Sequence, residues 1–402
     1  MITEQGNSLL ETRRKNRVLI KNSIFRKNVA LRTDIARELN LTLPTITNSV
    51  KEMIEEGILE ENTPPEDSSV KSMGRKPKPV SFRRDAGYAI GIEAGPYNTR
   101  AVLINLRGEV LESITDQLAS ESYQLMLLQM QNLISHLKKR IPDPNKLIGI
   151  GCGIPGFMDA NRGIVLSNYR ADWNHKNVVD DLSKISGCPV CLDNNVRFRA
   201  IGYEMMQKDI RTGMFAYLFI SRGVACPVFY GNDLLSGENT GAGELGQTIL
   251  LRQENKEGVK DLTVDDIASE KAILNRCEEE MKKGHLQALQ ERMKAGEPLG
   301  MRTILDLQMK GDPEIDSIID RCIRYEGIAT ANVVNLLNPN LIVVDAFLMS
   351  NQKNRDRLVR YARKYFYGIN EKDVTITFHS YDSYDGARGA ALGSIQKLFL
   401  NS

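Results

Sequence analysis

The sequence contains few of the residues that build metal centres. Its 402 residues include six cysteines and four histidines, and the histidines show no ligand spacing. Cys188-Pro-Val-Cys191 is the one CxxC pair. It is compatible either with half of a zinc or redox site or with small residues at the entry of a buried strand. Because no second pair completes a tetrahedral site, the buried strand is favoured.

Long hydrophobic runs are also missing. No stretch approaches the roughly 20 apolar residues that a membrane helix needs. The first residues, Met1-Ile-Thr-Glu-Gln-Gly6, lack the basic and then apolar pattern of a signal peptide. We therefore expect a cytoplasmic protein with reduced cysteines and no membrane partner. A length of 402 residues, with 42% hydrophobic and 26% charged residues, predicts two or three ordinary globular domains.

Charge is unevenly distributed, although the net charge is only +2. Residues 1–84 hold 16 basic against 11 acidic residues, and the other residues hold 37 basic against 40 acidic ones. A basic N-terminal part on a mildly acidic body is typical of a DNA-binding domain joined to a ligand-binding one. A surplus of five charges also arises by chance, so the pattern supports the interpretation only weakly.

The N-terminal part has the apolar spacing of three helices. The first covers residues 9–25, with Leu10, Val18, Leu19, Ile24 and Phe25 as its apolar positions. Thr33 is predicted to cap a short second helix, which ends at Asn40-Leu41. A third helix opens at Thr42, with Pro44 in its first turn. Its core-facing residues are Ile46, Val50, Met53 and Ile54.

A β-hairpin is expected to follow these helices, which predicts a winged helix-turn-helix over residues 1–84. Gly57 ends the third helix, a strand begins at Ile58, and Val80-Ser-Phe82 returns as the second strand. Short polar side chains on the third helix suit the major groove, and the basic loop Gly74-Arg-Lys-Pro-Lys78 suits phosphate. Any small three-helix domain gives similar periodicity, but the basic loop favours DNA. The predicted DNA-binding residues are Thr33, Thr42, Thr45, Thr47, Asn48, Lys51, Arg75 and Lys76.

The remaining residues alternate strands and helices, which predicts an α/β body of two similar lobes. Strand patterns at residues 88–93 and 100–106 recur near residue 215, and a buried strand at 341–345 follows a long helix. We expect one lobe at residues 85–200 and a second at 201–402, with the C-terminal helix returning to the first lobe. A cleft is expected between the lobes.

Five segments, in this order, resemble the ROK family (repressors, open reading frames and kinases) of the actin-like ATPase, ribonuclease H-like superfamily. The whole arrangement is similar to its transcriptional regulators of the xylose-repressor and N-acetylglucosamine-repressor type. The segments are Ile150-Gly-Cys-Gly-Ile-Pro-Gly-Phe-Met-Asp159, Leu166-Ser-Asn-Tyr-Arg-Ala-Asp-Trp173, Gly241-Ala-Gly-Glu-Leu-Gly246, Asn332-Val-Val-Asn-Leu-Leu-Asn-Pro339 and Gly386-Ala-Arg-Gly-Ala-Ala-Leu392. The resemblance covers almost the full chain.

The sequence departs from the family's kinases at their nucleotide-binding turns. In the first phosphate turn, Pro96 removes an N–H group and Tyr97 fills space. The second turn, Gly-Thr-Gly in kinases, is Ser221-Arg-Gly223, and the adenosine-side Gly-Gly is replaced in Asp345-Ala-Phe347. An Asp and a Phe would obstruct a nucleotide. We therefore predict no nucleotide cofactor and no kinase activity.

The family's catalytic base and zinc site are also altered. The simplest alignment places Asn195 at the base, where an amide cannot accept a proton, but a shift of two residues would place Asp193 there. Gln247 stands where the zinc-binding His is expected, and no cysteine occurs between Gln247 and Asp265. We predict no metal.

The resemblance implies that the sugar-binding side is retained. The predicted sugar-binding residues are Gly153, Asn194, Asn195, Glu244, Gln247 and Asp265. Paired carboxylates and amides suit vicinal hydroxyls, although the same residues also serve as helix caps and in turns. Trp173 is expected either beside the sugar cleft or in the core.

These features predict a sugar-responsive transcriptional regulator, with repression as the family default. Its expected partners are double-stranded operator DNA, a sugar or sugar-phosphate effector, and further copies of itself in a homodimer or dimer of dimers. One alternative is an ATP-dependent sugar kinase with an accessory DNA-binding head. Another is a binding protein whose head contacts a second protein.

Overall fold

The computed structural model describes residues 9–63, 78–95, 98–118, 122–207, 213–255, 258–370 and 372–402. The chain divides into two compact units, which are Met1–Asp209 with Tyr384–Ser402, and Ile210–Ser383. The predicted lobe boundary at residue 200 falls inside helix α6 (Asn195–Met206), which packs on α13 (Asp385–Ile395) and therefore belongs to the first unit. Among the described residues, no helix combines the length and apolarity needed to span a bilayer.

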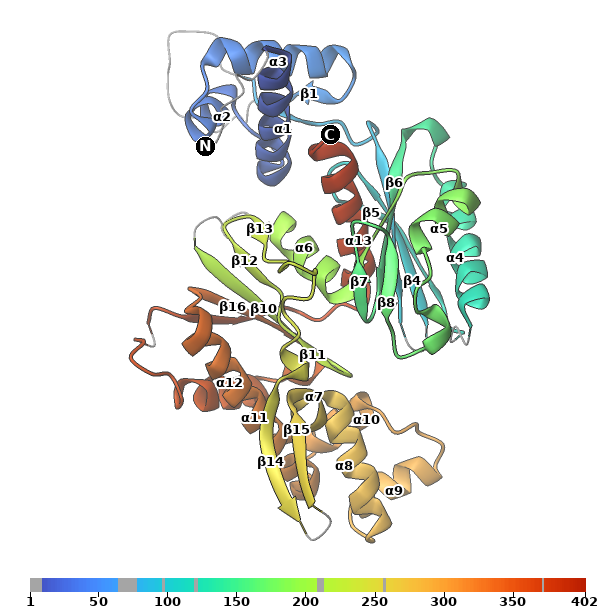
Figure 1. The fold of residues 1–402 in the computed structure, drawn as a ribbon, viewed down its shortest axis with the longest axis vertical. Coiled ribbons are helices and arrows are strands. Elements are labelled where there is room, and N and C mark those ends of the chain that lie inside the picture. Colours follow the sequence, from blue (N-terminus) through green and yellow to red (C-terminus); the bar gives the residue numbers. More distant parts are fainter. Residues whose placement is uncertain are drawn as a thin grey trace. The chain divides into compact units, whose positions relative to one another are not determined.

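The first unit begins with a winged helix-turn-helix (Figure 1), as the sequence predicts. Its helices are α1 (Leu9–Lys27), α2 (Arg32–Leu39) and α3 (Leu43–Glu55), and its hairpin pairs β1 (Leu59–Glu61) with β2 (Val80–Phe82). Asn40 takes the left-handed conformation at the end of α2, with φ of 51°, and so makes the tight turn. Thr42 caps α3, because its side chain accepts a hydrogen bond from the Thr45 N–H at 3.3 Å.

Two details of the head differ from the prediction. Thr33 is not the N-cap of α2, because the helix begins at Arg32 and Leu31 is the capping residue, without a side-chain hydrogen bond. In α1, Leu10 and Leu19 are exposed, and Ile20 takes the buried position one turn before Ile24. Ile24 and Phe25 are buried as predicted, so only the buried position around residue 19 lies one residue later than the sequence predicts.

The body of the first unit is a five-stranded sheet with the order β5-β4-β3-β6-β9. The strands β3, β6 and β9 are parallel, and β4 and β5 extend the sheet in antiparallel fashion. Their bounds are β3 Tyr88–Ala94, β4 Thr99–Asn105, β5 Val110–Asp116, β6 Leu147–Ile154 and β9 Val190–Asn194. A short hairpin, β7 (Phe157–Asp159) with β8 (Ile164–Ser167), follows β6, and η1 (Pro144–Lys146) and η2 (Ala171–Trp173) are single 3-10 turns.

The two faces of this sheet carry different residues, because successive residues of a strand point to opposite faces. The face with Ile90, Ile92 and Ile150 forms a core with α4 (Tyr123–Lys138) and α5 (Val178–Ser186). The other face carries Gly91 and Gly151, and α13 packs directly on their backbones. A Cβ atom would lie 1.9 Å from the Ala387 oxygen at Gly91 and 1.8 Å from the Ala390 oxygen at Gly151. These glycines therefore bring the last helix of the chain onto the sheet.

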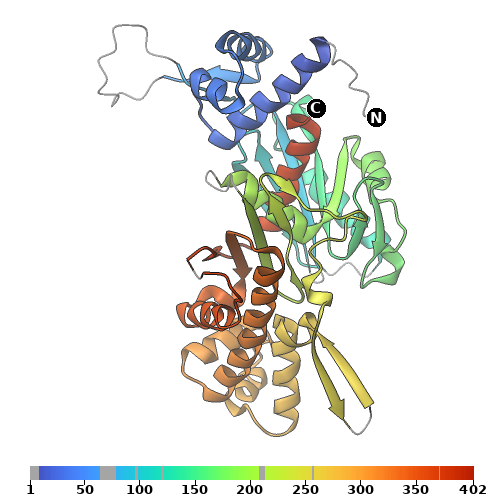
Figure 2. The same cartoon turned by 60° about the vertical axis from the view of Figure 1, so that its left-hand side comes forward.

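The second unit contains a sheet of order β13-β12-β10-β16-β17, with β11 paired to β10. These strands are β10 Met214–Ile220, β11 Val224–Ala225, β12 Val228–Tyr230, β13 Asp233–Leu234, β16 Leu341–Ala346 and β17 Thr375–Phe378. A separate hairpin, β14 (Ile249–Asn255) with β15 (Gly258–Thr263), projects from this unit (Figures 1 and 2). The helical elements are η3 Leu245–Gln247, α7 Val264–Ala268, α8 Glu270–Lys282, α9 Gln287–Lys294, α10 Met301–Met309, α11 Pro313–Leu337, η4 Phe347–Ser350 and α12 Gln352–Arg363.

Candidate functional site

The exposed side of α3 carries the polar residues predicted to read DNA. Thr42, Thr47, Asn48 and Lys51 are exposed, whereas Ile46, Val50 and Met53 on the same helix are fully buried. The Thr42 and Thr45 hydroxyls lie 2.8 Å apart, and Lys51 lies 3.8 Å from Glu55. Thr33 is exposed in the first turn of α2. The predicted wing contacts Arg75 and Lys76 lie outside the described residues.

The head is attached to the C-terminus of the chain by contacts that the sequence did not reveal. Lys21 of α1 is 3% exposed and donates hydrogen bonds to the carbonyl oxygens of Phe399 and Ser402. The Phe399 ring packs edge-on against Phe82 of β2 at a centroid distance of 5.9 Å. Arg26 of α1 forms an ion pair with Glu204 of α6 at 2.9 Å. The helix-turn-helix head therefore rests on α6 and on the turn η5 (Gln396–Leu400) that continues α13.

In the first unit, three predicted residues gather where the parallel strands end. Gly153 lies near the end of β6, Asn194 ends β9, and Asn195 begins α6. The Asn195 amide donates to the Glu93 carboxylate of β3 at 3.1 Å. A Cβ atom at Gly153 would lie 3.2 Å from the Asn195 Cα, so this glycine allows the approach. The carboxyl ends of parallel strands are where open α/β sheets bind ligands.

Glu93 and Asn194 have different surroundings in this group. The Glu93 carboxylate is 6% exposed, and its Oε2 atom has no hydrogen-bond partner within the described structure. It lies against Gly386 in the first turn of α13, where a Cβ atom would approach it to 2.3 Å. The Asn194 side chain caps α6, accepting from the Val196 N–H at 2.8 Å and donating to the Gly156 oxygen at 2.8 Å. Asn194 therefore performs the capping role that the sequence left open beside sugar contact.

Asp193, one of the two candidates for the former catalytic base, is buried in an ion pair. It is 4% exposed and accepts a hydrogen bond from the Arg197 Nε at 2.8 Å, and Lys397 lies 3.9 Å from its second oxygen. The side chain of Asn195, by contrast, is the one that meets Glu93. Trp173 is fully buried in the core of the first unit, which is the second of its two predicted positions.

In the second unit, Gln247 and Asp265 form a pair. The Gln247 amide donates to one Asp265 oxygen at 2.8 Å, and the Val224 N–H donates to the other at 2.7 Å. Burial raises the pKa of Asp265 above its ordinary value. A Cβ atom at Gly246 would lie 2.1 Å from the same carboxylate, so only glycine fits there. Glu244, which is exposed, precedes this group at the start of η3.

Buried carboxylates lie behind the turn that replaces the second phosphate loop. Glu270 donates its backbone N–H to the Ser221 oxygen at 2.7 Å and is 8% exposed. Burial raises its pKa to about 7, and the neighbouring Asp345 adds to this shift. Glu326, which is 2% exposed, has its pKa raised by burial to about 8, and Glu270 contributes. Asp345 is fully buried and accepts a hydrogen bond from the Tyr217 hydroxyl at 2.6 Å.

The obstructing residues of the first phosphate turn, Pro96 and Tyr97, lie outside the described residues. Of the CxxC pair, Cys191 is buried in β9 and Cys188 lies just before that strand. Neither of the two cysteines forms a disulfide. Within the described ranges, no three His, Cys, Asp or Glu side chains are arranged to hold a metal ion.

The first of the two units carries a winged helix-turn-helix and has polar residues at the ends of its parallel strands, and the whole defines a helix-turn-helix head on an actin-like sugar-kinase fold. The sequence profile of the ROK family matches residues 89–396, and the chain belongs to this family.

Known proteins resemble both the body and the whole chain. The xylose repressor of Caldicellulosiruptor bescii is 26% identical over 335 residues, which cover 82% of each chain. A solved ROK family transcriptional regulator, described as a homolog of the E. coli MLC protein, has a TM-score of 0.76 at 20% identity and covers 97% of each chain. A ROK glucokinase from Streptomyces griseus, solved with glucose and AMPPNP, has a TM-score of 0.66 at 18% identity. The match to that glucokinase covers 76% of this chain and 98% of its own.

Proposed function

We propose that the protein is a sugar-responsive, DNA-binding transcriptional regulator, acting as a repressor of carbohydrate-metabolism genes. The observation that carries this proposal is a complete helix-turn-helix on a sugar-kinase fold. The fold of a ROK regulator matches 97% of the chain, whereas that of a ROK glucokinase matches 76% and leaves a part of the size of the head unmatched. The xylose repressors, which are similar along most of their own length, support the same function.

In this proposal α3 enters the major groove of operator DNA. Thr47 and Asn48 face the base edges, because their short polar side chains can donate to and accept from bases. Lys51 contacts phosphate, as do Arg75 and Lys76 of the wing. Thr33, Thr42 and Thr45 position the helix pair on the backbone. Two copies of the chain present two such heads to a palindromic operator.

The effector is proposed to be a sugar. In the first unit the proposed contacts to its hydroxyls are Gly153, Asn194 and Asn195. In the second unit the candidates for sugar contact are Glu244, Gln247 and Asp265. The side-chain amides of Asn195 and Gln247 each donate one hydrogen bond to a carboxylate, of Glu93 and Asp265 respectively. Each amide keeps a second N–H and its oxygen available for a sugar hydroxyl. A sugar that binds one conformation of the protein better than another shifts the population toward it. That shift changes DNA affinity by the coupling free energy between the two sites.

Loss of kinase activity is part of the proposal. The Asp193 carboxylate is 4% exposed and is stabilised in its ionised form by Arg197, so it is poorly placed to take a proton from a substrate hydroxyl. Three buried acidic residues, Glu270, Glu326 and Asp345, lie behind the Ser221–Gly223 turn. The side chains of Asp345 and Phe347 stand where the family's kinases carry Gly-Gly, and they would obstruct a nucleotide. The alternative, a sugar kinase with an accessory head, requires ATP at these turns.

A titration of the purified protein against DNA from its own upstream region tests the function. The expected result is a specific complex at low salt, weakened by one sugar of a panel containing xylose, glucose and N-acetylglucosamine. The same sugar raises the melting temperature, because it binds the folded state. Absence of a specific complex at low salt would contradict DNA binding, since phosphate contacts are strongest there. ATP-dependent phosphorylation of any of the three sugars would favour the kinase.

A further inference from the structure

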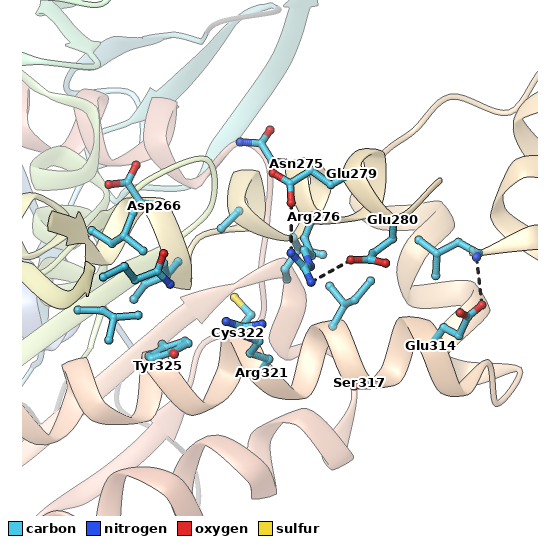
Figure 3. A pocket seen from close by; sticks show the side chains of 18 of the residues that line it. Asp266, Asn275, Arg276, Glu279, Glu280, Glu314, Ser317, Arg321, Cys322 and Tyr325 are labelled. Atoms are coloured by element: carbon cyan, nitrogen blue, oxygen red, sulfur yellow. Dashed lines mark hydrogen bonds and ion pairs between the residues drawn. The ribbon is translucent and has the colours of Figure 1, made fainter. Parts of the chain in front are cut away.

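The second unit contains a cavity of about 740 Å³ that belongs neither to the Gln247–Asp265 pair nor to the buried carboxylates (Figure 3). It lies between the hairpin β14–β15, helix α8 and the first half of α11. Part of its wall is apolar, with Leu262 and Ile273 buried and Ile318 partly buried. All of its lining residues come from the second unit, so the cavity exists independently of the first unit.

The acidic side chains around this cavity are already engaged. Asp266 accepts hydrogen bonds from the Thr263 N–H at 3.0 Å and the Thr263 hydroxyl at 2.9 Å. Glu314 accepts from the Leu286 N–H at 3.0 Å. Glu279 and Glu280 form ion pairs with Arg276 at 3.2 and 2.9 Å, which Figure 3 shows as dashed lines. Arg276 balances part of the negative charge of Glu279 and Glu280, and the hydrogen bonds fix the positions of the Asp266 and Glu314 carboxylates.

Several hydrogen-bond donors in the cavity remain unengaged. Arg321 and Lys260 are exposed, and neither makes a hydrogen bond or ion pair with the parts of the chain that the structure describes. The same holds for the Tyr325 hydroxyl. Figure 3 shows Arg321 and Tyr325 extending from neighbouring turns of α11 on the same side as Cys322. Residues four apart on a helix lie on one face, so the guanidinium and the hydroxyl can act together.

We propose that this cavity binds a small phosphomonoester, with its phosphate at Arg321, Lys260 and Tyr325. A phosphomonoester carries a charge of about −1.5 to −2 at pH 7, so it gains more than a single carboxylate does from a guanidinium and an ammonium whose side chains make no hydrogen bond or ion pair of their own in the described structure. The planar guanidinium of Arg321 bonds two phosphate oxygens at once. The carbon part of the ligand packs on Leu262 and Ile318. The phosphomonoester would thus be a second effector, bound at a site separate from that of the sugar.

Thermal unfolding and calorimetry of the full chain with glucose 6-phosphate, 3-phosphoglycerate and inorganic phosphate test this proposal. At a hundredfold excess over its Kd, a phosphomonoester is expected to raise the melting temperature by roughly 5 °C. Arg321→Ala removes a charged hydrogen bond and lowers the affinity about tenfold or more. Lys260→Ala lowers it less, because a lysine contributes a point charge.

Two control variants make the outcome decisive. Arg302→Ala removes another exposed arginine, on α10 and outside the cavity, and leaves the affinity unchanged. Asn195→Ala alters the group proposed for sugar and also leaves phosphomonoester binding unchanged. If Asn195→Ala abolishes binding and Arg321→Ala does not, the phosphate belongs to the sugar site and the proposal is wrong. It is equally wrong if none of the three probes binds at 10 mM, whatever the result of the DNA titration.

Discussion

The Nζ atom of Lys21, in the first helix, donates a hydrogen bond to the carbonyl oxygen of Ser402, the last residue, at 3.0 Å. Burial lowers the pKa of Lys21 to about 8, with Arg17 and Arg14 adding to the shift. The last carbonyls of a helix have no partner within it, and a lysine there satisfies them. Helix α1 of the head and the segment that follows α13 therefore stabilise each other.

Phe399→Ala should loosen this attachment. The ring contacts Phe82 and lies under the Lys21 ammonium at 4.9 Å. Losing it is expected to lower the free energy of unfolding by about 2 kcal/mol, from lost burial and a lost aromatic pair. Urea denaturation measures the change, and hydrogen exchange should accelerate in α1. Leu336→Ala, at a side chain that is 82% exposed, is the control and should change neither quantity.

Substitutions on α3 should separate base reading from phosphate binding. Asn48→Ala is expected to cost about 1–3 kcal/mol of affinity for the specific site and to relax the preference for one base pair. Lys51→Ala should weaken binding to all DNA sequences alike. It should also reduce the slope of log binding constant against log salt concentration by about one. Fluorescence anisotropy at several salt concentrations distinguishes the two. Lys282→Ala, at an exposed lysine in the second unit, should match the unaltered protein.

Asn195→Asp tests whether a carboxylate can return to the former base position. The aspartate cannot donate to Glu93 when ionised, and two carboxylates would then face each other across 3.1 Å. We expect a loss of about 1–3 kcal/mol in stability at neutral pH, and a smaller loss at pH 5, where one carboxyl is protonated. Asn174→Asp is the matched control, since its Oδ1 only accepts, from the Asn168 N–H at 2.8 Å. Equal losses in the two variants would contradict the proposed repulsion.

The buried carboxylates should make the protein less stable at alkaline pH. Burial raises the pKa of Glu326 to about 8 and that of Glu270 to about 7, above the usual 4.5. Both are fully protonated in the folded state below pH 4.5, and their contribution to stability is lost as pH rises through 7 and 8. The free energy of unfolding should therefore fall by roughly 4 kcal/mol between pH 6 and pH 9, since each group contributes about 1.4 kcal/mol per pH unit up to its folded-state pKa.

Glu326→Gln keeps the neutral form at every pH, so its stability should depend less on pH over this range. Urea titrations at pH 6, 7.5 and 9 measure the slope. Glu278→Gln, at an exposed glutamate, should retain the original slope. A Glu326→Gln protein with an unchanged slope would show that Glu326 is already ionised at pH 6.

Features that depend on neighbouring residues could be predicted from the sequence. The Thr42 cap, Pro44 in the first turn and the Ile46–Val50–Met53 stripe all follow from spacing within one helix. The N-cap of α2 was misplaced because Leu31 caps without a side-chain hydrogen bond, so it leaves no signal in the sequence.

Features that depend on distant residues could not be predicted. Lys21 looks like one more exposed basic residue of α1 until Phe399 and Ser402 are placed beside it. The choice between Asp193 and Asn195 required knowing which side chain meets Arg197 and which meets Glu93. The phosphate-turn substitutions were visible, but the burial of Glu270 and Glu326 behind that turn was not, since no local pattern marks an uncompensated charge.

Helix α13 begins where Gly386 touches the Glu93 carboxylate and continues, without a proline, into the turn whose carbonyls Lys21 binds. Some fourteen residues of helix span about 20 Å. Because α13 and η5 form one continuous helical segment, a tilt imposed at one end is expected to shift the other. A displacement of Glu93 by an ångström would thus be transmitted to the helix-turn-helix head by this one helical segment, without a chain of intermediate side-chain contacts.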